Sequence, residues 1–485
     1  MISDNVRVRF APSPTGYLHV GGLRTALYNY LFAKANNGTF VLRIEDTDQN
    51  RYVEGAVENL INTLNWVGLS YDEGPEKEGN YGPYFQSQRL DIYKKYALEL
   101  VEKGKAYYAF DSPERLQELR EKQIAEKLQP KYDKADLDLS PEEVKQKLDN
   151  GEPYVIRLNV VPGLRVTVND KIRGLVEFST DTVDDQILIK SDGYPTYHLA
   201  NVVDDHLMKI THVIRGEEWL PSTPKHVLLY DYLGWEKPEF AHLPLLLNPD
   251  KSKLSKRQGD VAVEDYKAKG YLKEALINFV ALLGWNAGDE KEFYQLEELI
   301  SSFSLERVHK AGAVFNLEKL DWLNFEHLRN KPENEVLEML KSELKASVYS
   351  DKEFTDEYLL KVIEAMRERV NFAKDFINNS PYFFEEPTSY DETVVSKRWK
   401  EDSPVLLKKL NDEFAALDNP TKEDYETALK KVAESESAGV GKLIHPLRLA
   451  VSGVGGGPGV YDILVIIGKE KTISRINKAI AEIKP

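Results

Sequence analysis

Two short loops carry the residue types that bind phosphate. The first loop, residues 11–22, places His19 three residues before Gly22. It joins a strand, predicted by the alternation over 6–10, to a helix that starts at Gly21 and Gly22. The free amides and the positive dipole end of such a helix attract anions, and glycines let a phosphate approach closely. A lone His-x-Gly also recurs by chance in surface turns, so this motif alone leaves both interpretations open.

The second loop is cationic and covers residues 251–257, Lys-Ser-Lys-Leu-Ser-Lys-Arg, after a strand expected at 240–247. Such a loop suits a polyphosphate, although a solvated basic turn has the same composition. The two loops follow the first and the last strand of one predicted sheet. Because ligands of open α/β folds bind at the carboxyl ends of the strands, the pair predicts a nucleotide site.

The elements that must position these loops alternate between strand and helix. Strands at 6–10 and 40–44, each followed by an amphipathic helix, imply a parallel sheet with right-handed crossovers. Residues 106–190 interrupt this order with charged helical pieces and short strands, which indicates an inserted α+β module. The alternation is expected to resume with strands at 186–190 and 211–215. We therefore predict an α/β Rossmann-type domain with an inserted α+β module.

Composition narrows the class of protein. The 485 residues are enough for two to four domains, and the net charge of −16 argues mildly against a nucleic-acid partner without excluding a basic face. The absence of cysteine excludes disulfides and thiolate zinc sites. Because no run of about 18 uncharged apolar residues and no secretory signal is present, we expect a cytoplasmic protein without a membrane span.

Four ordered motifs, spread over about 250 residues, resemble one enzyme family. The two loops are similar to the "HIGH" and "KMSKS" signatures of class I aminoacyl-tRNA synthetases. Arg-Ile-Glu-Asp-Thr-Asp (43–48), Tyr-Pro-Thr-Tyr-His-Leu-Ala-Asn-Val-Val-Asp-Asp-His (194–206) and Val-Ile-Arg-Gly-Glu-Glu-Trp (213–219) resemble the glutamyl branch. The first loop lacks the second His of the general class I signature, and the second loop ends in Arg257 where that signature has Ser. Both differences resemble the glutamyl branch.

The resemblance implies an enzyme that activates L-glutamate with ATP and Mg²⁺ and transfers it to the 3′ end of tRNA(Glu). The attacking carboxylate is already ionised at pH 7, so catalysis should consist of positioning and of stabilising charge on the phosphates. His19, Lys253 and Lys256 would supply that charge stabilisation. The ATP-binding positions implied by the resemblance are Pro12, Ser13, Thr15, Gly16, His19, Gly21, Gly22, Glu218, Leu245, Leu254, Ser255, Lys256 and Arg257.

A second set of positions is implied for the amino acid: Arg9, Ala11, Ser13, Glu45, Tyr197, Asn201 and Arg215. By charge, Arg215 and Arg9 would pair with carboxylates and Glu45 would face the ammonium group. Glutamine would leave a buried arginine incompletely paired, a penalty of a few kcal/mol. The alternative is that the two arginines form structural ion pairs with Glu45 or Glu217.

Acidic and glycine-rich segments elsewhere also have structural interpretations. Asp204, Asp205 and His206 suggest a metal site, but we favour a helix end, and Asp46 and Asp48 are metal ligands or acids at a helix N-terminus. Residues 439–442, Gly-Val-Gly-Lys, partly match a P-loop, but the first glycine and the Ser or Thr of that motif are absent. Some glutamyl enzymes bind zinc through cysteines in the inserted module. Because residues 106–110 contain no cysteine, we expect no zinc and no metal site among the protein side chains.

The chain after about residue 262 is dominated by helical periodicity, with one helix expected over 461–483. It resembles the all-α anticodon-binding domains of bacterial glutamyl enzymes, which separates it from β-barrel glutaminyl relatives and from the short queuosine-modifying paralogue. Arg369 matches a position that reads the third anticodon base in discriminating members; a helix-surface charge is the alternative. The domains implied are a catalytic domain in two halves (1–105 and 191–255), an acceptor-binding insertion (106–190), a stem-contact domain (256–330) and the anticodon-binding region (331–485).

Two other classes of protein remain as alternatives. A nucleotidylyltransferase shares the His loop and uses no RNA, but it lacks a long helical tail. A catalytically inactive RNA-binding paralogue would not need His19, Lys256 and the glutamate-site residues, all of which are intact. We therefore expect a ligase, and the family resemblance implies that it acts as a monomer.

Overall fold

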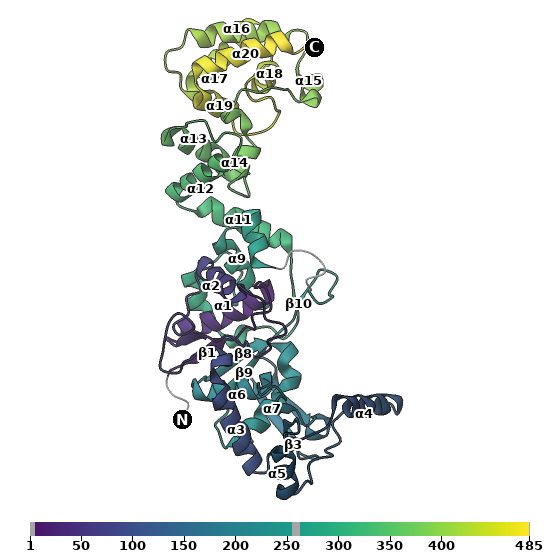
Figure 1. The fold of residues 1–485 in the computed structure, drawn as a ribbon. Helices are drawn as coiled ribbons and strands as arrows, with labels where there is room; N and C mark the ends of the chain where they lie inside the picture. Colours follow the sequence, from purple (N-terminus) through teal and green to yellow (C-terminus); the bar gives the residue numbers. More distant parts are fainter. Residues whose placement is uncertain (1–4, 255–261, 485) are drawn as a thin grey trace. The chain divides into compact units, whose positions relative to one another are not determined.

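The computed structural model describes residues 5–254 and 262–484, which form two compact units (Figure 1). Unit 1 holds the described residues up to Lys269 together with Leu276–Leu317. Unit 2 holds Gly270–Ala275 and the described residues from Glu318 onward. The domain boundaries expected from the sequence stay predictions, since they divide the chain more finely.

Unit 1 contains two pairs of parallel strands that meet side by side. β1 (Arg7–Phe10) pairs with β2 (Thr39–Leu42) across α1 (Val20–Ala35), and β8 (His212–Gly216) pairs with β9 (Glu239–Leu243) across α7 (Thr223–Leu233). The Thr211 amide donates to the Arg7 carbonyl at 2.9 Å, which joins β8 to β1. The chain leaves β1 and β8 in opposite directions across the sheet, so their carboxyl ends form the switch point where open α/β folds bind ligands.

The inserted module has a sheet of its own, of order β3-β4-β7, formed by Ala106–Ala109, Val155–Leu158 and Ile187–Ile189. The strand predicted at 186–190 exists, but its assignment to the parallel sheet is wrong because β7 pairs antiparallel with β4. The hairpin of β5 (Arg165–Asp170) and β6 (Gly174–Ser179) instead joins β9, through the partners Asp170 and Phe240. The result is a four-stranded sheet of order β6-β5-β9-β8.

Helices pack around these sheets and complete unit 1. The helices are α2 (Ala56–Trp66), α3 (Leu90–Glu102), α4 (Pro113–Ala125), α5 (Pro141–Asp149), α6 (Tyr197–Leu207), α8 (Val263–Lys269) and α10 (Leu296–Ser302), and α9 (Lys273–Ala281) begins in unit 2. Val168 of β5, Leu199 of α6 and Leu229 of α7 share one apolar core. The last strand predicted at 240–247 is divided: β9 ends before Pro244, and β10 (Leu246–Leu247) pairs with β11 (Ala313–Val314). Proline cannot donate to a strand ladder, which accounts for the break.

Unit 2 is entirely helical within the residues described. Its helices are α11 (Leu317–Asn330), α12 (Glu333–Ala346), α13 (Asp356–Met366), α14 (Asp375–Asn378), α15 (Glu392–Arg398), α16 (Ser403–Ala415), α17 (Lys422–Ser435), α18 (Gly441–Ser452), α19 (Val460–Ile467) and α20 (Lys469–Glu482). The single helix expected over 461–483 is two helices, because Gly468 adopts a φ of 86° between them. The predicted fold class, α/β followed by an all-α C-terminal part, is confirmed.

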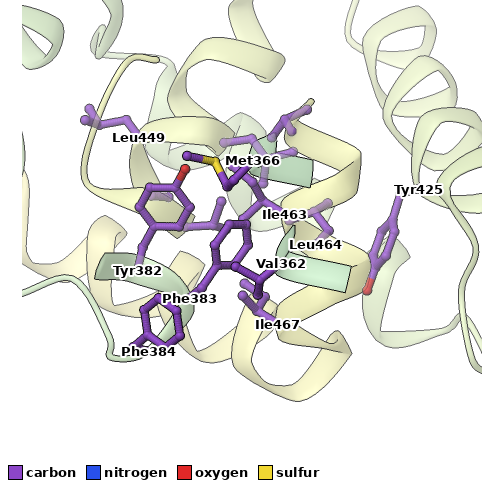
Figure 2. Close-up of a cluster of buried hydrophobic side chains, with 14 of the residues drawn as sticks. Val362, Met366, Tyr382, Phe383, Phe384, Tyr425, Leu449, Ile463, Leu464 and Ile467 are labelled. Carbon is purple, nitrogen blue, oxygen red and sulfur yellow. The ribbon is translucent and has the colours of Figure 1, made fainter. Parts of the chain in front are cut away.

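One apolar core holds the helices of unit 2 together. Figure 2 shows Val362 and Met366 of α13 beside Ile463 and Ile467 of α19, with Phe383 packed against them. These five side chains are all buried. Burying a large apolar side chain contributes about 1.5–3 kcal/mol, so this contact between distant parts of the chain stabilises the helical arrangement.

Acid is expected to destabilise unit 2 through His327 of α11. This side chain is 4% exposed, and burial lowers its pKa from 6.5 to about 4 although Glu274 acts against the shift. Its contribution to stability is fully present above pH 6.5 and is lost as the pH falls towards 4, about 3 kcal/mol in total. His327→Asn should flatten this dependence, measured by hydrogen exchange of α11 peptides between pH 7 and pH 4.5. Equal slopes in the two proteins would contradict the prediction.

Candidate active site

A cavity of about 580 Å³ opens in unit 1 where β1 and β8 end. Its lining includes every predicted ATP- and glutamate-site residue that the structure describes: Arg9, Ala11, Pro12, Ser13, Thr15, Gly16, His19, Gly21, Gly22, Glu45, Tyr197, Asn201, Arg215, Glu218, Leu245, Lys253 and Leu254. Ser255, Lys256 and Arg257 lie outside the described residues, and Arg369 belongs to unit 2. Residues from both ends of a 250-residue stretch thus meet in one site.

His19 is the N-cap residue of α1 at the edge of this cavity. Its Nδ1 accepts a hydrogen bond from the Gly22 amide at 3.2 Å. A neutral imidazole that accepts at Nδ1 carries its proton on Nε2, so Nε2 is the donor. A Cβ at Gly21 would lie 3.0 Å from the His19 ring, and one at Gly22 would lie 2.8 Å from the Leu18 side chain. Gly21 therefore leaves room for the imidazole over the helix N-terminus, where the dipole favours an anion.

Buried arginines and carboxylates form an ion-pair network beside the cavity. Asp205 accepts from Arg9 at 3.0 Å and from Arg43 at 2.7 Å, and Glu45 accepts from Arg43 at 3.1 Å. With its amide oxygen facing the arginines, Asn201 accepts from Arg9 at 3.2 Å. The alternative pairing of Arg9 with Glu45 is wrong, because Asp205 takes Arg9. Arg89 and Asp204 also belong to this network and form an ion pair at 2.7 Å. The network therefore contains three arginines and three carboxylates, and their formal charges cancel.

The structure shows which partners the acidic residues of the two quoted motifs have. Asp204 and Asp205 lie in α6 near its end, which confirms the helix interpretation, and both pair with arginines. Asp46 accepts from the Ser87 amide at 2.8 Å, and Asp48 pairs with an exposed arginine. The interpretation of Asp46 and Asp48 as acids at a helix N-terminus is wrong, because α2 begins only at Ala56.

Arg215 differs from these arginines because its partners are neutral. It is 4% exposed and donates to four side chains at 3.0–3.2 Å: Tyr197 Oη, Thr223 Oγ1, His242 Nε2 and His226 Nδ1. The expected alternative partner Glu217 pairs with Arg173 instead and accepts from the Leu245 amide at 2.8 Å. No carboxylate in the described part of the chain forms an ion pair with Arg215. Within the described residues, the positive charge of Arg215 is therefore uncompensated at the cavity wall.

The imidazoles around Arg215 are neutral at pH 7. Burial lowers the pKa of His242 even though Asp170 acts against it, and burial lowers the pKa of His226 well below the usual range. His198, 3.1 Å from His226, has its pKa lowered by burial to about 3. By contrast, burial raises the pKa of Glu45, against the opposing effect of Arg43. The imidazoles that contact Arg215 therefore add no further positive charge beside its guanidinium.

The chain matches known proteins over its whole length. Residues 5–322 match the family described as "tRNA synthetases class I (E and Q), catalytic domain", and residues 335–480 match an anticodon binding domain. The chain belongs to the class I tRNA synthetases. A glutamate–tRNA ligase of Chloroherpeton thalassium is 55% identical over 99% of this chain and 98% of its own length. A crystal structure of a glutamate tRNA ligase from Elizabethkingia meningosepticum, in complex with its amino acid, is 45% identical with a TM-score of 0.95, covering 99% of this chain and 100% of that one.

The second signature loop of this class I synthetase begins as a return of the chain onto β10. The Leu254 amide donates to the Leu246 carbonyl at 2.9 Å, which brings Lys253 to the cavity wall. After the undescribed residues, the Val263 amide donates to the Leu18 carbonyl at 2.9 Å. The described ends of this segment therefore both attach beside the cavity.

Sequence reasoning missed several residues that shape the synthetase site. They are Arg43, Asp170, His198, Thr223, His226 and His242. Two of them, Arg43 and His198, lie in the motifs quoted above, where they were given no role. Within residues 5–254 and 262–484 there is no group of three or more His, Cys, Asp or Glu side chains that could hold a metal ion. None of the helices formed by these residues is long and apolar enough to cross a membrane.

Proposed function

We propose that this chain is a glutamate–tRNA ligase that makes glutamyl-adenylate from L-glutamate and ATP and transfers the glutamyl group to tRNA(Glu). The uncompensated charge of Arg215 carries the proposal. The side-chain carboxylate of glutamate would supply the missing counter-charge inside the cavity. Glutamine, which is neutral, would leave the buried guanidinium unpaired, and such a loss costs about 3–5 kcal/mol. The relatives named glutamate–tRNA ligase support the same substrate.

The ammonium group of the substrate glutamate requires an anionic partner in the same cavity. We propose that Glu45 holds the ammonium group, since it lines the cavity and, among the described side chains, only Arg43 lies at hydrogen-bond distance from its carboxylate. Burial raises the pKa of Glu45, so its charge is lost at a higher pH than that of an ordinary glutamate. The α-carboxylate would then point towards the loop after β1, where α1 begins.

In the proposed reaction the α-carboxylate oxygen attacks the α-phosphorus of ATP. A C–O–P bond forms, the α–β phosphoanhydride bond breaks, and pyrophosphate leaves with its electron pair. The nucleophile is already ionised, so no general base is needed. His19 Nε2, the amides at the start of α1 and Lys253 would stabilise charge on the phosphates. Lys256 keeps the same proposed role, and Mg²⁺ would enter as part of the nucleotide substrate, held by phosphate oxygens.

ATP–pyrophosphate exchange tests the proposal. With glutamate and ATP we expect exchange when tRNA(Glu) is present and none without it. Exchange driven by another amino acid would overturn the assignment. The proposal includes a monomer that works in the cytoplasm, and sedimentation of the purified chain checks the first point.

We further propose that unit 2 binds the tRNA anticodon and that Arg369 contacts a base. Arg369 ends a short 3-10 segment after α13. The residues four positions before and after it are Ala365 and Ala373, so the alternative of a helix-surface ion pair has no partner there. Burial and the charge of Arg369 lower the pKa of Arg448, which donates to the Pro458 carbonyl at 2.7 Å. Two arginines are thus close together beside a glycine-rich turn.

Arg369→Gln is expected to reduce the preference for tRNA(Glu) over tRNA(Gln). Losing one bidentate arginine–base contact costs about 1–3 kcal/mol, or roughly 5- to 150-fold in the ratio of kcat/KM values. Charging of the two purified tRNAs measures the ratio. Lys361→Gln, which removes one charge from the exposed face of α13, is the control and should leave it unchanged. An equal loss with both tRNAs would count against a base contact by Arg369.

A further inference from the structure

We propose that Asp170 and His242 are positioning residues that keep Arg215 available as the counter-charge for a substrate carboxylate, and that they thereby set the preference for glutamate over glutamine. The inference rests on the proposed function, because it concerns the same amino-acid site. Neither side chain lines the cavity, so both would act through Arg215 and not on the substrate.

A continuous chain of hydrogen bonds connects the three side chains. Asp170 Oδ2 lies 2.6 Å from His242 Nδ1, and His242 Nε2 accepts from Arg215 Nε at 3.1 Å. The side chains of Asp170 and His242 are fully buried. Asp170 Oδ1 is held in turn by the amides of Ile172 at 3.0 Å and Arg173 at 2.8 Å. The carboxylate therefore has one fixed orientation towards the imidazole.

This arrangement determines which imidazole nitrogen carries the proton. Burial acts against the charge of Asp170, but hydrogen bonds from His242 and the Arg173 amide outweigh it and hold the pKa of the carboxyl below its ordinary value. An ionised Asp170 can only accept, so His242 carries its proton on Nδ1 and presents a lone pair at Nε2. Only that tautomer can accept from Arg215 Nε, since the other would set two N–H groups against each other.

The imidazole also separates the carboxylate from the guanidinium. Arg9, in the same cavity wall, is bound directly by Asp205 through two hydrogen bonds, of 3.0 and 3.2 Å, and its charge is compensated. Arg215 meets a neutral ring where Arg9 meets a carboxylate. Direct contact with Asp170 would fix Arg215 equally well but would remove its unpaired charge. The ring therefore provides orientation without neutralisation, which is what selection of an anionic side chain requires.

The fold explains why this carboxylate is available. Asp170 is the last residue of β5, and its pairing with Phe240 is the register contact between the β5–β6 hairpin and β9. His242 lies two residues further along β9. The point where the hairpin attaches to the parallel sheet is therefore the point that orients the ring next to Arg215.

Asp170→Asn provides a sharp test because it preserves shape. The asparagine oxygen can keep the two amide hydrogen bonds, which turns its NH₂ group towards His242 Nδ1. The ring must then carry its proton on Nε2, facing Arg215. We expect the KM for glutamate to rise about 10- to 100-fold, the selectivity for glutamate over glutamine to fall by a similar factor, and the KM for ATP to stay unchanged.

A second variant separates positioning from a general loss of structure. In Asp170→Asn with His242→Gln, the glutamine oxygen can accept from Arg215 Nε whatever residue occupies position 170. We expect this double variant to recover most of the lost glutamate affinity. Asp181→Asn is the matched control, since Asp181 caps the same hairpin through the Gly163 amide and the Ser179 hydroxyl.

The outcomes distinguish this inference from the proposed function. If the unmodified chain fails to exchange pyrophosphate with glutamate in the presence of tRNA(Glu), the proposed function is wrong. If it exchanges and Asp170→Asn behaves like Asp181→Asn, only the positioning role is overturned. A parallel rise in the KM values for glutamate and ATP without rescue by His242→Gln would equally overturn it.

Discussion

Arg215→Ala is expected to lower kcat/KM for glutamate in pyrophosphate exchange by about 10²- to 10⁴-fold, the equivalent of the 3–5 kcal/mol lost when one partner of a buried ion pair is removed. In the unmodified enzyme Arg215 is 4% exposed, and its side-chain partners among the described residues are all neutral. A bound glutamate would therefore give Arg215 a counter-charge that no carboxylate among the described residues supplies. Exchange assays with tRNA(Glu) and varied glutamate measure the effect.

Thermal unfolding distinguishes Arg215 from the neighbouring Arg9. Arg215→Ala removes a buried charge that forms no ion pair with a described carboxylate, and relief of that charge offsets the loss of its four hydrogen bonds, so we expect a small change in Tm. Arg9→Ala leaves Asp205 with one arginine fewer in a buried network and should destabilise unit 1 clearly. Arg165→Gln, on a side chain that is 81% exposed, is the control for loss of one charge. Glutamate kinetics that are unchanged in Arg215→Ala would refute the role proposed for this residue.

Arg215→Gln asks a narrower question about charge. Glutamine retains hydrogen-bond donors but is neutral, so the variant should activate glutamate poorly and discriminate weakly against glutamine. Arg215→Lys keeps the charge and loses the planar fork, which makes an intermediate loss the expected result. If the glutamine variant kept its preference for glutamate, charge recognition by Arg215 would be wrong.

The lining of the cavity could be predicted from the sequence because its residues lie in contiguous motifs that resemble the glutamyl branch. The partners inside it could not. Arg43 and Asp205 are 162 residues apart and lie on β2's continuation and on α6, so only the packed fold decides which carboxylate each arginine meets. Glu45 is close in sequence to both Arg9 and Arg43, and it was considered as a partner for Arg9. In the structure Glu45 pairs with Arg43 instead. Local sequence motifs therefore predict which residues line the site, but only the tertiary structure determines which ion pairs they form.

The same limit applies to the strands. The apolar segment at 186–190 predicts a strand, but nothing local states that β7 pairs with β4 rather than with the parallel sheet, since pairing is a long-range contact. His226 and His242 carried no sequence signal at all: each becomes meaningful only because α7 and β9 bring it beside Arg215. The residue types Pro244 and Gly468 favour a break in a strand and in a helix, respectively. The sequence analysis nevertheless predicted one continuous element at each place, because the apolar periodicity continues on both sides of the break.

His19→Asn is expected to lower the rate of pyrophosphate exchange about 100- to 1000-fold, the usual effect of removing one donor to a developing charge. The choice of asparagine matters because His19 has two roles. Its Nδ1 accepts from the Gly22 amide as the N-cap of α1, and its Nε2 is proposed to donate to an ATP phosphate. Asparagine is among the best N-cap residues, so this variant removes the donor and retains the cap.

His19→Ala removes both roles and supplies the comparison. Loss of the cap costs about 0.5–2 kcal/mol of stability, whereas the loss of rate should match that of His19→Asn. Two variants with the same low rate and different Tm values would separate anchoring of the helix from stabilisation of the phosphates. If asparagine instead restored the rate along with the Tm, the helix N-terminus with Gly21 and Gly22 would be the whole of the phosphate site, and the imidazole would serve only to begin the helix.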